Sequence, residues 1–307
     1  KINRQRRIKV KRYEMKRIDV ERKEINKKDY IRRTARLSDV SRHIKEDAII
    51  YHNGKPILLY KVLSTPPKDV RWAVKNIKYS TGKRTHGLVN TSAVFGYSPR
   101  QENKHDYCTS SAMGYNTPKQ HYIISNFAKQ IQKYYKDYFH ETYKQHKEKV
   151  KEKVKDQWVI KDTVFTSGIV NKNNQLKYHF DSGNFKNVYS NMLVFKSDVM
   201  GGHLVIPEID ISLEVADNSV TIFDGQDLLH GVSPIDYNNS KAYRYSIVYY
   251  SLERMWQCMT IEEEVDRIRE KKMIREQNRL KPEHLDTLRQ RKKEAKDYKD
   301  KIEDEQK

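Results

Sequence analysis

The sequence predicts an α+β protein with a β-sandwich or jelly-roll core and helices around it. Between residues 158 and 252, short apolar and β-branched runs alternate with clusters of Asn, Gly, Asp and Ser, which is the pattern of many strands joined by turns. Before them, residues 118–155 carry apolar side chains at three- and four-residue steps. That spacing predicts one long amphipathic helix that covers a sheet.

The composition leaves room for one large domain with helical additions. The chain has 307 residues, of which 36% are hydrophobic and 33% charged. The net charge of +20 favours a polyanionic partner, and a solvated basic surface without a specific partner is the alternative. Only Cys108 and Cys258 occur, far apart and in no CxxC spacing, so we expect neither a disulfide partner nor a cysteine-based zinc site.

No stretch of the sequence is apolar enough to suggest a membrane segment. The chain has neither a run of membrane-spanning length nor an apolar stretch of the signal-peptide type. We therefore expect an intracellular, soluble protein with no membrane partner.

Residues 1–47 predict a basic helical extension. Residues 1–45 contain 18 Lys and Arg against 6 Asp and Glu, and their sparse apolar positions follow a weak helical period. A basic arm for nucleic acid and an exposed charged helix packed loosely on the body both fit this pattern.

Residues 48–252 predict the core domain. Asn53-Gly54 between two apolar runs predicts a β-hairpin, and residues 68–78 predict a short helix. Residues 84–117 are polar and rich in turn residues, which predicts a long loop. Pro118 is well placed to open the covering helix of 118–155. The expected strands lie at 159–170, 175–180, 187–195, 202–207, 211–215, 219–224, 228–235 and 243–252.

Residues 253–307 predict a charged helical extension. They contain 16 basic and 15 acidic side chains, few apolar positions, and an interruption at Pro282. Mixed charge of this kind is typical of a solvated helical face, so we assign no chemistry to it.

Two histidines and one aspartate predict a metal site. His179 and Asp181 are two residues apart on an expected strand, so their side chains project from the same face. His230 follows about fifty residues later at a strand–turn junction. Two histidines and one carboxylate form the facial triad that suits non-haem Fe(II) and leaves positions open for O2 and a co-substrate. The alternative is two surface histidines and a turn aspartate.

Arg244 predicts a site for a carboxylate. It lies in the strand-like run 243–250, where an inward arginine is costly unless it is paired. The guanidinium matches a carboxylate with two parallel hydrogen bonds, and Ser246 shares its face. The pair would suit the distal carboxylate of 2-oxoglutarate. An internal salt bridge to Asp224 or Asp227 is the alternative.

Residues 178–252 resemble the double-stranded β-helix of Fe(II)/2-oxoglutarate dioxygenases. Within that superfamily they most resemble the TET/JBP group, which oxidises the methyl group of 5-methylpyrimidines in DNA. The likeness is carried by His179-x-Asp181-x-x-Asn184, by GGHLVIP (201–207) with FDGQDLLHGVSP (223–234), and by the closing strand from Arg244 to Tyr250. Upstream, FGYSPR (95–100) is similar to a pattern in some relatives.

The resemblance implies a site and its cofactors. It implies that His179, Asp181 and His230 hold Fe(II), and that Arg244 and Ser246 hold 2-oxoglutarate, with O2 as the other co-substrate. It also implies base readers and one further cationic contact. These are Asn184 by hydrogen bonding, Tyr250 by stacking, and Arg100 with the co-substrate or the DNA backbone.

The resemblance further implies oxidation of 5-methylcytosine or thymine in double-stranded DNA to the 5-hydroxymethyl form and possible further stages. The target base would be flipped, and the basic arm and the Arg and Lys residues of 66–84 would contact phosphates.

The departures from the family leave the target base open. Leu252 stands where animal TET enzymes have a histidine that contacts cytosine, and their cysteine-rich zinc module is absent. The composition is more similar to that of microbial or phage members. We therefore expect the protein to be located in the cytoplasm of a microbe or of a phage-infected cell, or in the nucleus if the source is a eukaryote. A 2-oxoglutarate-dependent hydroxylase acting on RNA or protein, and an inactive nucleic-acid-binding module, are the alternatives.

Overall fold

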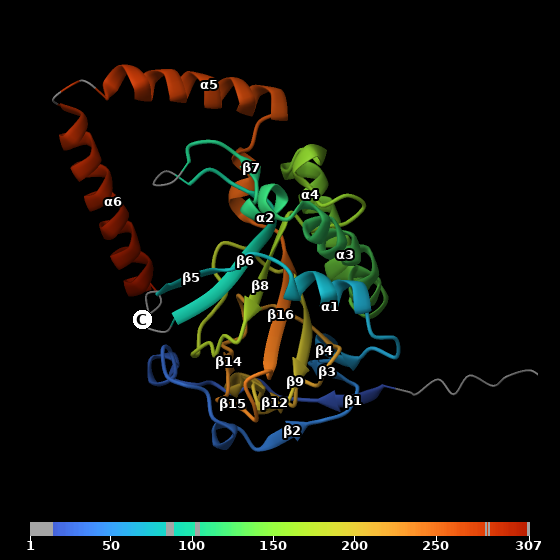
Figure 1. The fold of residues 1–307 in the computed structure, drawn as a ribbon. Helices are drawn as coiled ribbons and strands as arrows, with labels where there is room; N and C mark the ends of the chain where they lie inside the picture. The colour runs from blue at the N-terminus through green and yellow to red at the C-terminus, as the bar shows by residue number, and fades with distance from the viewer. Residues whose placement is uncertain (1–14, 84–88, 102–104, 280, 282, 306–307) are drawn as a thin grey trace, which may run out of the picture.

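The computed structural model describes residues 15–83, 89–101, 105–279, 281 and 283–305, which form two main sheets flanked by helices (Figure 1). The strands are β1 (Lys16–Asp19), β2 (Arg42–Ile44), β3 (Ala48–His52), β4 (Lys55–Val62), β5 (Ser80–Lys83), β6 (Val89–Ser98), β7 (Thr109–Ser110), β8 (Ser167–Lys172), β9 (Ser190–Ser197), β10 (Val199–Gly201), β11 (Leu204–Ile206), β12 (Ile211–Leu213), β13 (Ser219–Phe223), β14 (Gly231–Val232), β15 (Ile235–Tyr237) and β16 (Tyr243–Tyr250). The helices are α1 (Lys68–Lys75), α2 (Ala112–Asn116), α3 (Pro118–Tyr138), α4 (His140–Lys153), α5 (Ile261–Asn278) and α6 (Glu283–Glu305).

The larger sheet has the strand order β1-β3-β4-β13-β9-β16-β8-β6-β5, with β7 paired to β6. The smaller sheet has the order β14-β11-β12-β2, and β10 pairs with β15. An apolar cluster that includes Val194 and Phe223 of the large sheet and Leu204, Ile206 and Ile211 of the small one packs the two sheets together. This arrangement confirms the jelly-roll core within an α+β fold.

Strand β16 shows how the sequence gives the sheet two different faces. Successive side chains of a strand point to opposite sides. Tyr245, Ile247 and Tyr249 enter the core beneath the helices, whereas Arg244 and Ser246 line a pocket on the other side. The alternation in the sequence therefore separates packing from chemistry within one strand.

The hairpin predicted at Asn53-Gly54 is confirmed. Both residues have positive φ, 49° and 73°, as the tight turn between β3 and β4 requires, and glycine adopts such a conformation without steric cost. The short helix expected at 68–78 is also confirmed, as α1.

The covering helix is present but is not continuous. Pro118 opens α3, and an apolar stripe that includes Ile124, Phe127 and Ile131 packs on the large sheet. The helix ends at Tyr138; the next residue, Phe139, has a φ of −133° and a ψ of 50°, which are not helical, and α4 begins after it. The Phe139 side chain is buried in the same cluster.

Predictions for three segments are wrong, two before the main strand region and one within it. Residues 15–47 contain no α-helix; instead β1 pairs in parallel with β3, and β2 with β12, using the sparse apolar positions Ile18 and Ile44. The first 14 residues of the predicted arm lie outside the described residues. The expected loop at 84–117 contains β6, which pairs with β8 through Ala93, Phe95 and their neighbours. Residues 175–180 do not form a regular strand, and only His179 makes an isolated bridge.

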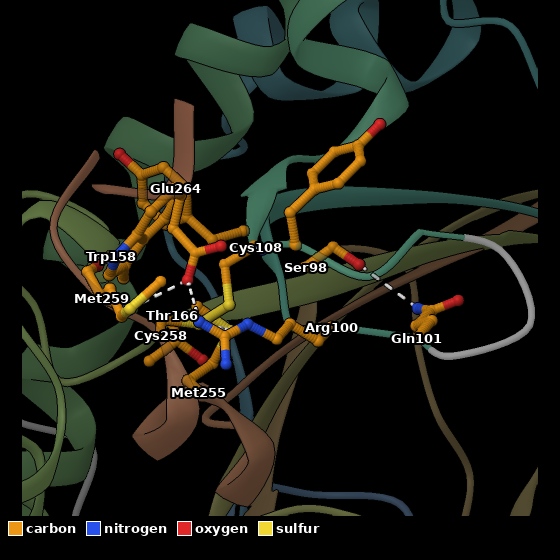
Figure 2. Close-up of a disulfide and its surroundings, with 12 residues drawn as sticks. Ser98, Arg100, Gln101, Cys108, Trp158, Thr166, Met255, Cys258, Met259 and Glu264 are labelled. Carbon is orange, nitrogen blue, oxygen red and sulfur yellow. Dashed lines mark hydrogen bonds and ion pairs between the residues drawn. A yellow bond between two sulfur atoms is a disulfide. The ribbon is translucent and has the colours of Figure 1, made fainter. Parts of the chain in front are cut away.

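The two cysteines form a disulfide, which corrects the expectation from their separation in the sequence (Figure 2). The Cα atoms of Cys108 and Cys258 lie 5.7 Å apart because the segment before β7 and the segment after β16 meet in space. Beside them, the buried carboxylate of Glu264 accepts hydrogen bonds from Arg100 Nη2 at 2.6 Å and from the backbone N–H groups of Cys108 and Met259 at 3.0 Å. This cluster fastens the start of α5 to the body.

The charged C-terminal extension is helical, as predicted, and breaks between α5 and α6. Helix α5 runs away from the sheets, and α6 turns back along the left side of the view (Figure 1). Among the described helices, none is long and apolar enough to cross a membrane.

His146 of α4 gives the fold a predicted sensitivity to acid. Its side chain is fully buried; Nε2 lies 2.8 Å from Ser251 Oγ, and Nδ1 has no hydrogen-bond partner among the described residues. Burial, with a smaller contribution from Lys149, lowers the pKa of His146 to about 3. The unfolded chain protonates near the ordinary histidine pKa, so stability is fully present above about pH 6.5 and falls as the pH drops toward 3.

When the pH is lowered from about 7.5 to about 5, we expect His146 to decrease the free energy of unfolding by roughly 2 kcal/mol. In His146→Gln, the amide nitrogen can donate to Ser251 but cannot titrate, so that part of the pH dependence should disappear. Urea denaturation at the two pH values measures it. Equal pH dependence in both proteins would contradict the assignment.

Candidate metal centre and co-substrate pocket

The structure brings His179, Asp181 and His230 together. One ligand atom from each lies within 4.8 Å of the others, and the Nε2 atoms of His179 and His230 are 3.7 and 3.9 Å from Asp181 Oδ1. The two histidine segments are held in register by exchanged backbone hydrogen bonds, 2.9 Å from His179 N to His230 O and 3.1 Å in return. A bridge, rather than the strand expected from the sequence, therefore places the donors.

The hydrogen bonds of the imidazole rings orient the two histidines for metal binding. His179 Nδ1 lies 2.7 Å from Lys177 O, and His230 Nδ1 lies 2.9 Å from Leu228 O. A carbonyl oxygen only accepts, so each Nδ1 carries a proton, and in the neutral form of each ring it is Nε2 that has the lone pair facing Asp181. Two neutral imidazoles and one carboxylate are the donor set that non-haem Fe(II) requires.

Gly225 leaves the space in which the Asp181 carboxylate lies. Asp181 N donates to Gly225 O at 2.8 Å. A Cβ atom added to Gly225 would lie 2.3 Å from Asp181 Oδ2 and 3.3 Å from His230 Cε1. A side chain at residue 225 would therefore collide with the carboxylate of the candidate metal centre.

Seven of the eight residues that the sequence suggested line one pocket. They are His179, Asp181, Asn184, His230, Arg244, Ser246 and Tyr250. Apolar side chains, among them Ile169, Met192 and Val248, form the remaining wall. Arg100 is the exception, because it is engaged with Glu264 beside the disulfide and does not line the pocket.

Arg244 is a buried cation without an anionic partner among the described residues. Its side chain is 3% exposed, and Nε has no hydrogen-bond acceptor there. The proposed salt bridges to Asp224 and Asp227 do not form: Asp227 pairs with Arg22, and Asp224 accepts from backbone N–H groups. Burial lowers the pKa of Arg244 to about 10, so the side chain remains charged at neutral pH. A carboxylate in the pocket would compensate this charge.

Sequence reasoning missed two pocket asparagines. Asn174 Nδ2 donates to Asn171 Oδ1 at 3.0 Å, and Asn171 Nδ2 lies 3.4 Å from Ser246 Oγ. Thr91 N fixes the other end by donating to Asn174 Oδ1 at 2.9 Å. Asn171 lies on the same strand face as Ile169, so the alternation of side chains along the strand could have placed it in the pocket. The polar run from Asn171 to Asn174 resembles a turn, which hid this signal.

Comparison with known proteins establishes the class of enzyme. A family model described as the oxygenase domain of the 2OGFeDO superfamily matches residues 95–253. The protein is thus an oxygenase of the type that uses Fe(II), 2-oxoglutarate and O2. The matched segment is more than half of the chain, and the chain belongs to the family of that model, Tet_JBP.

One solved structure shares the fold, and a second one matches more weakly. A structure titled "NgTET1 in complex with 5mC DNA" is 15% identical, with a TM-score of 0.51 over 80% of this chain and 100% of that one. An oxidoreductase of the 2OG-Fe(II) oxygenase family from Burkholderia pseudomallei is 10% identical, with a TM-score of 0.39 over 62% of this chain and 84% of that one. No curated protein matches the sequence.

Proposed function

We propose that this enzyme oxidises the 5-methyl group of a methylated pyrimidine in DNA, with 5-methylcytosine as the first candidate. The observation that carries the proposal is that one pocket contains the candidate metal donors, an arginine whose Nε has no acceptor among the described residues, and residues suited to hold a base. Membership of the Tet_JBP family and a fold shared with NgTET1, whose structure contains 5mC DNA, support it.

Each group of pocket residues has its own part in this reaction. His179, Asp181 and His230 would hold Fe(II) through the two Nε2 atoms and a carboxylate oxygen. When bound, Fe(II) with 2-oxoglutarate and O2 supplies the oxidant that hydroxylates a C–H bond, while 2-oxoglutarate becomes succinate and CO2. Arg244 and Ser246 would bind the distal carboxylate, and the apolar wall would exclude water from the reacting atoms.

Asn184 and Tyr250 would hold the target base. Asn184 is 8% exposed, and its amide can donate to or accept from a pyrimidine edge. Tyr250 offers an aromatic face in the same pocket, whereas Leu252, which pairs with Asn184 in a short bridge, adds only an apolar surface. A methyl group inside a duplex does not reach such a pocket, so the base would be flipped out.

The direct test is product analysis on defined DNA. Purified protein with Fe(II), 2-oxoglutarate and a duplex carrying 5-methylcytosine should yield 5-hydroxymethylcytosine in nucleoside mass spectrometry. A duplex without 5-methylcytosine reports oxidation of thymine in the same assay. We expect His179→Ala to lower the yield by at least about 100-fold, because it removes one of three protein donors.

Two results would count against the proposal. Turnover on RNA or on a peptide, with no oxidised pyrimidine in either DNA, would move the substrate to another class. Full activity of His179→Ala would remove the metal assignment.

A further inference from the structure

The N-terminal strap, which we define as residues 20–36, runs beside the segment that carries His179. Arg32 N donates to Tyr178 O at 3.0 Å, and Tyr178 N donates to Arg33 O at 3.0 Å. Tyr178 immediately precedes His179 in the sequence. The strap therefore pairs with the backbone directly next to a metal donor.

The strap also packs against the residues that flank both histidines. Tyr178 and Leu229, which precede His179 and His230, are completely buried in one cluster with Ala35 of the strap. The fit is close at Gly231, where an added Cβ would lie 2.9 Å from Ala35 Cβ and 3.0 Å from Tyr178 Cδ1. Movement of the strap would thus be transmitted to both donor segments.

Arg22 connects the strap to the loop that leads to His230. Its Nη1 lies 2.7 Å from Asp227 Oδ2, and its Nη2 donates to Asp227 O at 2.6 Å and to Glu208 Oε2 at 2.8 Å. Glu208 is 2% exposed, and its other cation, Lys27, is farther away at 3.6 Å. Arg22 therefore compensates a buried carboxylate and fixes a backbone carbonyl three residues before His230.

We propose that Arg22 is a positioning residue for the metal centre, and that the strap sets the separation of the two histidine segments. The same loop contains Gly225, whose carbonyl accepts from Asp181 N, so Arg22 acts on the surroundings of all three donors. Lys23 of the strap also pairs with a carboxylate, that of Asp210, at 2.9 Å. The inference rests on the proposed metal centre and is independent of the DNA substrate.

Titration calorimetry of the metal-free protein with Mn(II), without DNA, tests this role. We expect Arg22→Gln to weaken Mn(II) binding by about tenfold, the effect typical of losing a residue that supports metal ligands. Arg17→Gln is the matched control, because Arg17 pairs with Asp19, where both side chains are more than half exposed, and lies 4.1 Å from the ring centroid of Tyr51. Neither contact involves the segments that carry the histidines. It should bind Mn(II) as the wild type does.

Further variants separate positioning from folding. Arg22→Lys keeps a charge near Glu208 but loses the two-pronged contact with Asp227, so we expect partial recovery of affinity. If Arg22→Gln does not fold, Asp227→Asn tests the inference in its place, because it leaves the ion pair between Arg22 and Glu208 intact. We expect Asp227→Asn to bind Mn(II) severalfold more weakly than the wild type.

Wild-type affinity in a folded Arg22→Gln protein, or in Asp227→Asn where that variant decides, would overturn the inference. His179→Ala shows which claim has failed. If that variant also binds Mn(II) normally, the metal centre itself is misassigned; if only the His179→Ala protein loses binding, the role of Arg22 is refuted.

Discussion

Replacing Arg244 by methionine is expected to stabilise the enzyme while removing its affinity for 2-oxoglutarate. The guanidinium is buried, and among the described residues its Nε has no acceptor. Burial lowers its pKa to about 10. At pH values below about 10 the side chain is charged in the folded state, and this buried charge lowers the free energy of unfolding. Methionine removes the cost, so the unfolding free energy of the metal-free, co-substrate-free protein should rise by about 2 kcal/mol.

The same substitution should raise the KM for 2-oxoglutarate by about 100-fold, equivalent to about 3 kcal/mol, because a charge-assisted pair in a buried site is lost. Urea denaturation without ligand and steady-state kinetics with varied 2-oxoglutarate measure the two effects. Arg244→Lys is the control: it keeps the charge without the planar fork and should recover little affinity. A variant that is less stable yet has an unchanged KM would contradict the assignment of Arg244.

The residues of the candidate metal site could be selected from the sequence because part of their signal is local. His179 and Asp181 are separated by one residue, and the closing strand places Arg244 and Ser246 on one face by simple alternation. Such spacings hold even where the regular strand is absent, since two extended residues suffice to project side chains to the same side. The expected strand around His179 was wrong, but the geometry that depended on it was retained.

What the sequence did not predict depends on contacts between distant segments. The two cysteines are 150 residues apart, and only the meeting of two chain segments beside Glu264 brings them together. Residues 15–47 looked like a basic helix because their apolar positions are few. They pair in parallel with β3 and β12, and a local hydrophobic periodicity contains no information about such pairing partners.

Gly225→Ala is expected to destroy the metal centre without unfolding the protein. The added methyl group would lie 2.3 Å from Asp181 Oδ2, which is closer than any non-bonded contact allows. Gly225 is not among the glycines with positive φ, so alanine can adopt the backbone conformation. The free end of the Asp181 side chain is the group that must move, and it then no longer faces the two histidines.

We expect Gly225→Ala to weaken Mn(II) binding at least tenfold and to lower turnover by about 100-fold, while the unfolding temperature changes little. Titration calorimetry, product analysis and thermal unfolding of the metal-free protein measure the three quantities. Gly82→Ala is the matched control, because an added Cβ there has no atom within 4 Å and its φ is not positive. Normal Mn(II) affinity in Gly225→Ala would show that Asp181 is not a metal donor, whereas a large loss of stability would show that Gly225 serves the fold instead.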